Sequence, residues 1–292
     1  MFEPTDEGVL AELVVAPRVN HRLGVAMPRL HLLLDDEGGG AHRPACERSN
    51  TEQTLARDRD LTERFGRSVE QLGSNDVVIR VGGVFAMERF ALDAFAIAGA
   101  GRDIDWRMAL DLLAAFARER SSALGDETPQ APADVVEAVR VLGRFSSRTG
   151  ADEPVDIIYN LSGVCLVGAT ISNTYLHHAD LRGADLTRAR LGHAHLAGAN
   201  LGRTKMSRSW LTGSNLVEAD LYKADLRRAW LTGADLSRAH LREADLTGAG
   251  LINADLSGSH LVDATLSEAK LRDIKYTDDT TWPEGFQPPR SR

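Results

Sequence analysis

Residues 219–248 read ADLYK ADLRR AWLTG ADLSR AHLRE ADLTG, one five-residue pattern written six times. The pattern extends from Leu161 to Leu271, where every fifth residue is a large aliphatic one. Of these 23 positions 21 are leucine, and the residue two places earlier is small in 21 cases, alanine in 16 of them; only Tyr159 and Val164 are large. The residue between the two is mostly polar, often Asp or Asn, which we expect to tolerate a corner and to bond the backbone there.

A period of five matches neither a single helix, which repeats about every 3.6 residues, nor a strand, which repeats about every two. A closed coil resolves the mismatch if the small residue and the leucine both point inward and the chain then turns a corner. Alanine beside leucine fills such a narrow interior without overpacking it. The predicted structural core includes Leu181, Leu201, Leu221, Leu226 and Leu241.

A second period gives the number of sides. The segment SWLTG at Ser209–Gly213 recurs as AWLTG at Ala229–Gly233, and Arg188, Arg208 and Arg228 recur at the same interval of 20 residues. Twenty residues are four pentapeptides, so the sequence predicts a four-sided coil. Residues i and i+20 then lie above one another at the strand spacing of about 4.8 Å.

The repeat resembles the pentapeptide repeat protein family, with near-ideal copies in ADLRG at 179–183 and ADLTG at 244–248. The resemblance implies a right-handed, four-sided parallel β-helix over residues 155–275. The segment Phe65–Phe90 resembles a helical segment that precedes the repeats in many actinobacterial members, relatives that often carry membrane helices upstream. The sequence TTWPEGFQP at 280–288 resembles a common ending of such proteins.

The rest of the chain divides into three expected parts. Residues 1–48 are predicted to be a flexible N-terminal segment, residues 49–150 a small helical bundle that caps one end of the rod, and residues 276–292 a tail whose Trp282 and Phe286 cap the other end. Helices are expected from Ser49 to Leu72 and over Val84–Ala98, Trp106–Arg120 and Ala133–Phe145. The expected breaks between them are Gly82-Gly83, Gly99–Gly101 and the stretch with Pro129 and Pro132.

Composition excludes several classes of protein. The net charge of −8 disfavours a sequence-independent DNA or RNA binder, which needs a basic surface. Cys46 and Cys165 form no CxxC motif, which excludes a disulfide scaffold and a cysteine zinc site and favours a reducing, cytoplasmic compartment. The acidic start MFEPTDEG does not look like a signal peptide, and the longest apolar runs fall short of a spanning helix. Peripheral membrane attachment is left open.

No catalytic or cofactor-binding set emerges from the motifs. HEXXH and GxSxG are absent, and Gly38–Gly40 lacks the Lys-Ser/Thr of a phosphate loop. His177, His178, His193 and His195 cluster in two successive coils, but His177 and His178 are expected to point away from His195 without stacking on it, so no metal site is predicted. We expect the chain to be non-enzymatic and to hold neither a metal nor a cofactor.

One outward column is unusual. Arg190, Trp210 and Trp230 occupy equivalent positions in successive coils. Two interpretations stay open: a ladder that packs on itself or on a neighbouring loop, and a patch that binds a partner. Our hypothesis is that these three residues are the partner-contact strip.

The predicted function is a non-enzymatic protein–protein interaction scaffold that presents a rigid rod to a protein partner. The alternative, implied by gyrase-protecting relatives, is a DNA mimic that binds a type II topoisomerase, DNA gyrase. That role requires a negatively charged rod. Here residues 155–292 carry 16 acidic and 16 basic side chains, so the net charge lies in residues 1–154.

Overall fold

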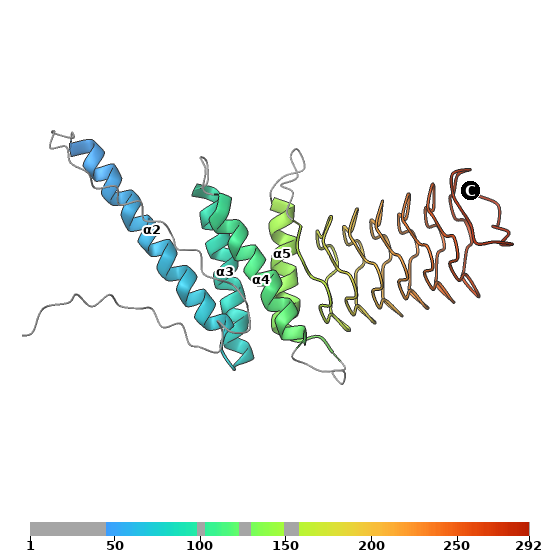
Figure 1. Ribbon diagram of the computed structural model, residues 1–292, viewed down its shortest axis with the longest axis horizontal. Coiled ribbons are helices and arrows are strands. Elements are labelled where there is room, and N and C mark those ends of the chain that lie inside the picture. The colour runs from blue at the N-terminus through green and yellow to red at the C-terminus, as the bar shows by residue number, and fades with distance from the viewer. Residues whose placement is uncertain (1–44, 98–102, 123–129, 149–157, 292) are drawn as a thin grey trace, which may run out of the picture.

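The computed structural model describes residues 45–97, 103–122, 130–148 and 158–291. Four helices precede a rod of stacked coils (Figure 1): α2 (Ala45–Leu72), α3 (Val77–Ile97), α4 (Asp103–Ser122) and α5 (Ala133–Arg148). Of the predicted segment 1–48, residues 1–44 lie outside the described residues, and α2 begins at Ala45. The expected breaks at 99–101 and at Pro129 also lie outside them.

Helix α3 begins earlier than predicted and runs through the glycine pair that was expected to separate two helices. Its start is capped by Asp76, whose carboxylate accepts a hydrogen bond of 2.7 Å from the N–H of Val78. A Cβ atom added at Gly83 would lie 2.8 Å from the backbone nitrogen of Leu72 in α2. Gly82-Gly83 is therefore not a break, because glycine at 83 lets α3 approach α2 closely.

The bundle is held by aromatic packing and by one buried ion pair. The rings of Trp106 and Phe145 stack with centroids 5.5 Å apart, and Phe95 meets both edge-on. Asp134, at the start of α5, is fully buried and accepts a hydrogen bond of 2.5 Å from the guanidinium of Arg80 in α3. This pair joins the beginnings of α3 and α5.

The rod has four pentapeptides per coil. Parallel bridges join residue i to residue i+20 from Asn160↔Asp180 to Asp255↔Lys275. Each bridge is a single residue, and the described part of the rod contains no extended strand, because the chain turns a corner after every five residues. The strands of the expected parallel β-helix are thus reduced to isolated bridges; the right-handed sense of the coil stays a prediction.

The pentapeptide around Leu226 shows how the backbone is satisfied. Three N–H groups donate to neighbouring coils and one closes the turn: Asp225 to Thr204, Leu226 to Asp245, Arg228 to Thr247, and Ala229 to Leu226, at 2.8 to 2.9 Å. The fifth N–H, of Arg227, donates to the carboxylate of Asp225 at 3.1 Å. The Asp or Asn of the repeat thus supplies the acceptor that the backbone lacks.

The corner itself depends on a different residue. The position two after each leucine has a positive φ, 56° at Arg228 and 67° at Gly248. Glycine adopts this left-handed conformation without steric cost, whereas arginine adopts it less readily. Asp or Asn was expected to tolerate the corner, and this part of the expectation is wrong, since its role is the hydrogen bond.

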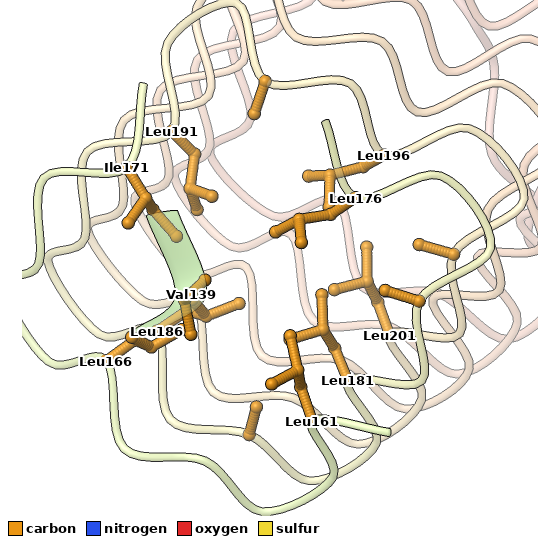
Figure 2. Packing of buried hydrophobic residues seen from close by; sticks show 14 of the residues in the cluster. Val139, Leu161, Leu166, Ile171, Leu176, Leu181, Leu186, Leu191, Leu196 and Leu201 are labelled. Carbon is orange, nitrogen blue, oxygen red and sulfur yellow. The ribbon is translucent and has the colours of Figure 1, made fainter. Parts of the chain in front are cut away.

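The leucines form ladders along the inside of the rod. Leu161, Leu181 and Leu201 lie one behind another in successive coils (Figure 2). The predicted core residues Leu181, Leu201, Leu221, Leu226 and Leu241 are all at most 1 % exposed. Each coil is therefore stabilised mainly by the coils directly before and after it.

Helix α5 covers the first coil. Val139 points into the ring formed by the first leucines (Figure 2). The guanidinium of Arg140 donates two hydrogen bonds, of 2.7 and 3.0 Å, to the carbonyl of Thr170. Tyr159 is fully buried at this junction, and burial raises the pKa of its hydroxyl to about 12. The bundle and the rod therefore share one continuous hydrophobic core.

At the opposite end the chain folds back over the last coil. Trp282 meets Tyr276 edge-on with ring centroids 5.4 Å apart and stacks on Phe286 at the same distance. All three rings pack against the hydrophobic core. This arrangement covers apolar surface that a truncated solenoid would leave open.

Candidate functional site

Arg190, Trp210 and Trp230 lie on one side of the rod in three successive coils, and we call them the Arg–Trp strip. Bridges pair Arg190 with Trp210 and Trp210 with Trp230. The two indole rings stack with centroids 5.0 Å apart and an angle of 5° between their planes. The guanidinium carbon of Arg190 lies 5.5 Å from the Trp210 ring centroid, within cation–π range. The structure therefore brings together all three residues that the sequence proposed.

Self-stacking does not bury the tryptophans. Trp210 is 46 % exposed and Trp230 is 54 % exposed, although each contacts the other over one ring face. No loop covers them in the described part of the chain. Within the described residues the strip is thus a solvent-facing aromatic surface on which no loop packs.

The side that carries the strip differs from the other three in its central outward residues. They are Thr170, Arg190, Trp210, Trp230, Gly250 and Lys270, without a single Asp or Asn. Each of the other three sides has at least three Asp or Asn residues in the equivalent column. Pentapeptides on this side therefore lack the hydrogen bond from a backbone N–H to an Asp or Asn side chain that the repeat forms elsewhere.

The strip has one open end. Trp210 is enclosed between Arg190 and Trp230, but the other neighbour of Trp230 in the column is Gly250. A Cβ atom added at Gly250 would meet only the carbonyl oxygen of Ala229, at 3.8 Å. The outer face of the Trp230 ring is consequently free of a side chain from the next coil, which leaves room for a planar group from outside.

Three arginines occupy the corner beside the strip: Arg188, Arg208 and Arg228, which we call the arginine column. They lie two residues before the members of the strip, at positions with φ of 56° to 59°. Together with the hydroxyl groups of Thr187 and Ser207 they line a groove of about 730 Å³. The sequence showed the spacing of this column but not that it borders a groove.

Another arginine in the same groove is already neutralised. Arg227 makes two hydrogen bonds, of 2.7 and 2.8 Å, to the carboxylate of Asp225. The hydrogen bond from Arg227 lowers the pKa of Asp225 below its ordinary 3.8. Arg227 therefore holds a carboxylate of its own chain, whereas the arginine column does not.

The histidines are arranged differently from the prediction. Tyr175 stacks on His195 with centroids 4.1 Å apart, and the ring of His177 lies 5.6 Å from His195. Burial and the two neighbouring histidines lower the pKa of His177. The expectation that His177 points away from His195 is therefore wrong, but the two rings are tilted by 49° and do not stack, as predicted. Within the described residues no three His, Cys, Asp or Glu side chains converge as metal ligands.

None of the four helices, over the residues that are described, has both the length and the apolar character needed to cross a bilayer.

Comparison with known proteins agrees with the repeat. The family model described as pentapeptide repeats matches residues 165–208, 199–238 and 234–273, with 8 copies. The chain belongs to the pentapeptide repeat family. No curated protein matched it.

Several solved structures are similar over the repeat. The pentapeptide repeat protein Rfr23 from the cyanobacterium Cyanothece 51142 is 40 % identical over 32 % of this chain and 63 % of its own, with a TM-score of 0.32. The pentapeptide repeat protein alr5209 from Nostoc is 41 % identical over 35 % of this chain and 77 % of its own, with a TM-score of 0.28. QnrB1, a plasmid-mediated fluoroquinolone resistance protein, is 17 % identical over 39 % of this chain and 65 % of its own, with a TM-score of 0.27.

The chain thus spans less than two thirds of the length of Rfr23.

Proposed function

We propose that the chain is a non-enzymatic protein–protein interaction scaffold and that the Arg–Trp strip contacts its partner. The observation that carries the proposal is the stacked pair Trp210 and Trp230, about half exposed on the one side without Asp or Asn. Exposed tryptophan is costly in water, and tryptophan and arginine are the residues most enriched at binding hot spots.

Rigidity supports the same conclusion. The backbone of each strip residue is held on the preceding coil by two hydrogen bonds. In Trp210 the N–H donates to the Ala189 carbonyl at 2.9 Å, and the carbonyl accepts from the Leu191 N–H at 2.7 Å. A partner that docks on side chains already stacked in place does not have to order them on binding. The strip is therefore preorganised in the way that high-affinity contacts require.

The open end of the strip suggests what the partner inserts. Arg190, Trp210 and Trp230 form a stack, and the free face of the Trp230 ring above Gly250 has space for one more planar group. An aromatic ring or an arginine guanidinium from the partner has the required shape and stacks favourably on indole. We expect one such side chain in the partner segment.

The alternative of a DNA mimic that binds DNA gyrase is less well supported. A mimic must reproduce the negative charge line of the duplex. Residues 155–292 have equal numbers of acidic and basic side chains, and the corner beside the strip is basic. A supercoiling assay with purified gyrase tests this alternative: inhibition or protection by the chain would favour it.

Capture from cell extract with the full chain as bait tests the strip. Trp210→Ala combined with Trp230→Ala removes the stacked pair. Gly250→Arg instead extends the ladder over the free face of Trp230, at a residue whose φ is not positive and whose Cβ has space. Both variants should lose the same set of partners.

The matched control is His240→Ala combined with His260→Ala. These residues are paired at equivalent positions on another side of the rod, with ring centroids 5.3 Å apart. The control should keep every partner that the tryptophan and Gly250 variants lose. If all three variants capture the same partners as the unmodified chain, the partner binds elsewhere and the Arg–Trp strip is not the contact surface.

A further inference from the structure

The arginine column beside the strip has the geometry of an anion clamp. Arg188, Arg208 and Arg228 follow one another at the coil spacing of about 4.8 Å. The column ends in glycine on both sides, at Gly168 and Gly248. It is therefore a compact site three coils long, open at both ends, rather than part of an extended basic track.

The three arginines lack counter-ions. In the described part of the chain none of them forms an ion pair, whereas nearby Arg227 is bound to Asp225. The hydroxyl groups of Thr187 and Ser207, which line the same groove, make no hydrogen bond within those residues either. Guanidinium and hydroxyl donors thus face the groove together with no acceptor from the chain itself.

The spacing favours one kind of anion. A carboxylate is fully bound by one guanidinium in a two-pronged contact, as Asp225 shows with Arg227. A phosphate monoester has three terminal oxygens and nearly two negative charges at neutral pH. It can accept hydrogen bonds from two guanidinium groups about 5 Å apart and from a hydroxyl between them. Two adjacent arginines and one hydroxyl therefore match its acceptors better than those of a carboxylate.

We propose that the arginine column binds a phosphoserine or phosphothreonine side chain of the partner segment that docks on the Arg–Trp strip. This inference rests on the proposed function in taking the partner to be a protein. Column and strip lie in the same coils, with Arg208 two residues before Trp210 and Arg228 two residues before Trp230. One peptide segment can reach both.

A nucleic acid fits the same groove less well. Single strands bind along basic grooves that follow many phosphates, and their affinity depends on the number neutralised. Here the track ends after three coils, and Glu268 occupies the column position just beyond Gly248. The net charge of −8 further opposes a polyanion at long range.

Short degenerate peptide libraries with a fixed central phosphoserine, serine or glutamate test the proposal on the immobilised full chain. We expect the phosphoserine library to be retained about tenfold or more over the other two, as charge-assisted hydrogen bonds predict. Sequencing of the retained peptides should show an aromatic residue or arginine at a fixed distance from the phosphoserine. Gly250→Arg should abolish that second preference and leave the first.

The variants separate a clamp from diffuse charge. Arg208→Gln removes the member common to both arginine pairs and should lower retention about tenfold or more, whereas Arg188→Gln or Arg228→Gln leaves one pair intact and should lower it less. Arg203→Gln is the matched control, because Arg203 is exposed, has a φ of 58° and lies at another corner of the rod. Its retention should equal that of the unmodified chain.

Equal retention of the glutamate library, equal losses in all four variants, or stronger retention of single-stranded DNA at the column would each overturn the proposal. Partner capture distinguishes this failure from failure of the proposed function. One outcome is that capture is lost with the tryptophan variants but persists with Arg208→Gln and after phosphatase treatment of the extract. That result would support the Arg–Trp strip as the partner contact and reject the phosphate site.

Discussion

Asp235 shows how an Asp or Asn side chain, where the pentapeptide has one, completes the hydrogen bonding of the coil. Its carboxylate accepts the N–H of Ser237 at 3.0 Å and the hydroxyl of the same residue at 2.6 Å. The other four N–H groups of a pentapeptide are satisfied by backbone carbonyls. The abundance of Asp and Asn in the repeat is therefore a consequence of one missing acceptor per turn.

Replacing Asp235 separates this role from the role of its charge. Asp235→Asn keeps an oxygen acceptor in the same place, so its free energy of unfolding should change little. Asp235→Ala removes the acceptor and should cost about 1 kcal/mol. Urea denaturation of both variants measures the difference. Equal losses in the two would mean that the negative charge, not the acceptor, is what matters.

Much of the residue-scale picture was predictable. The period of five predicted the inward leucines, and the period of 20 predicted that Trp210 and Trp230 stack. The sequence shows that the column of Trp210 and Trp230 has no Asp or Asn. The consequence of that absence follows only from the structure, where the Asp of a pentapeptide accepts the N–H two residues later, as Asp225 does from Arg227. That the arginine column lacks counter-ions depends on side-chain positions, which periodicity does not give.

At the scale of elements, glycine was the residue that sequence patterns described least well. Gly82-Gly83 was interpreted as a break, yet it lies within α3, because the reason for Gly83 is contact with α2. Gly143 in α5 has a similar role against the rod. A Cβ atom there would lie 3.1 Å from Cβ of Thr174 and 3.2 Å from the backbone nitrogen of Tyr175. Such approaches are tertiary, so local patterns do not reveal them.

Enlarging Gly143 tests the junction between bundle and rod. Gly143→Leu should push α5 away from the first coil and cost about 1–3 kcal/mol, the range typical of overpacking. Gly66→Leu is the control, since a Cβ at Gly66 in α2 meets nothing within 4 Å. It should be neutral or slightly stabilising because leucine favours helix over glycine. Thermal melts compare the two, and equal effects would argue against close packing of α5 on the rod.

At the scale of the whole molecule, the rod depends on its two covered ends. The first coil has fully buried leucines, Leu161 and Leu166, because α5 lies over them (Figures 1 and 2). At the other end, the covering consists of single aromatic rings around Trp282. A solenoid needs only neighbouring coils for most of its stability, but an exposed end promotes association.

Two fragments test this dependence. A fragment from Asp152 to the C-terminus should keep a β-rich circular dichroism spectrum, yet self-associate through its uncovered first coil. A fragment from Ala45, which keeps α5 together with the helices packed on its other face, should fold with less association. Light scattering after size exclusion measures both. An unfolded shorter fragment would instead show that the bundle is required for the rod to form.

The central claim is that Trp210 and Trp230 serve contact rather than packing, and their effect on stability tests it most directly. Denaturant unfolding of the full chain compares Trp210→Ala with Trp230→Ala, made together, against the single core change Leu226→Ala. The account predicts a loss of about 0.5–1.5 kcal/mol for the tryptophan pair, the value of one aromatic stack. For the fully buried Leu226 it predicts about 2–5 kcal/mol. A loss for the tryptophan pair as large as that for Leu226 would contradict the account.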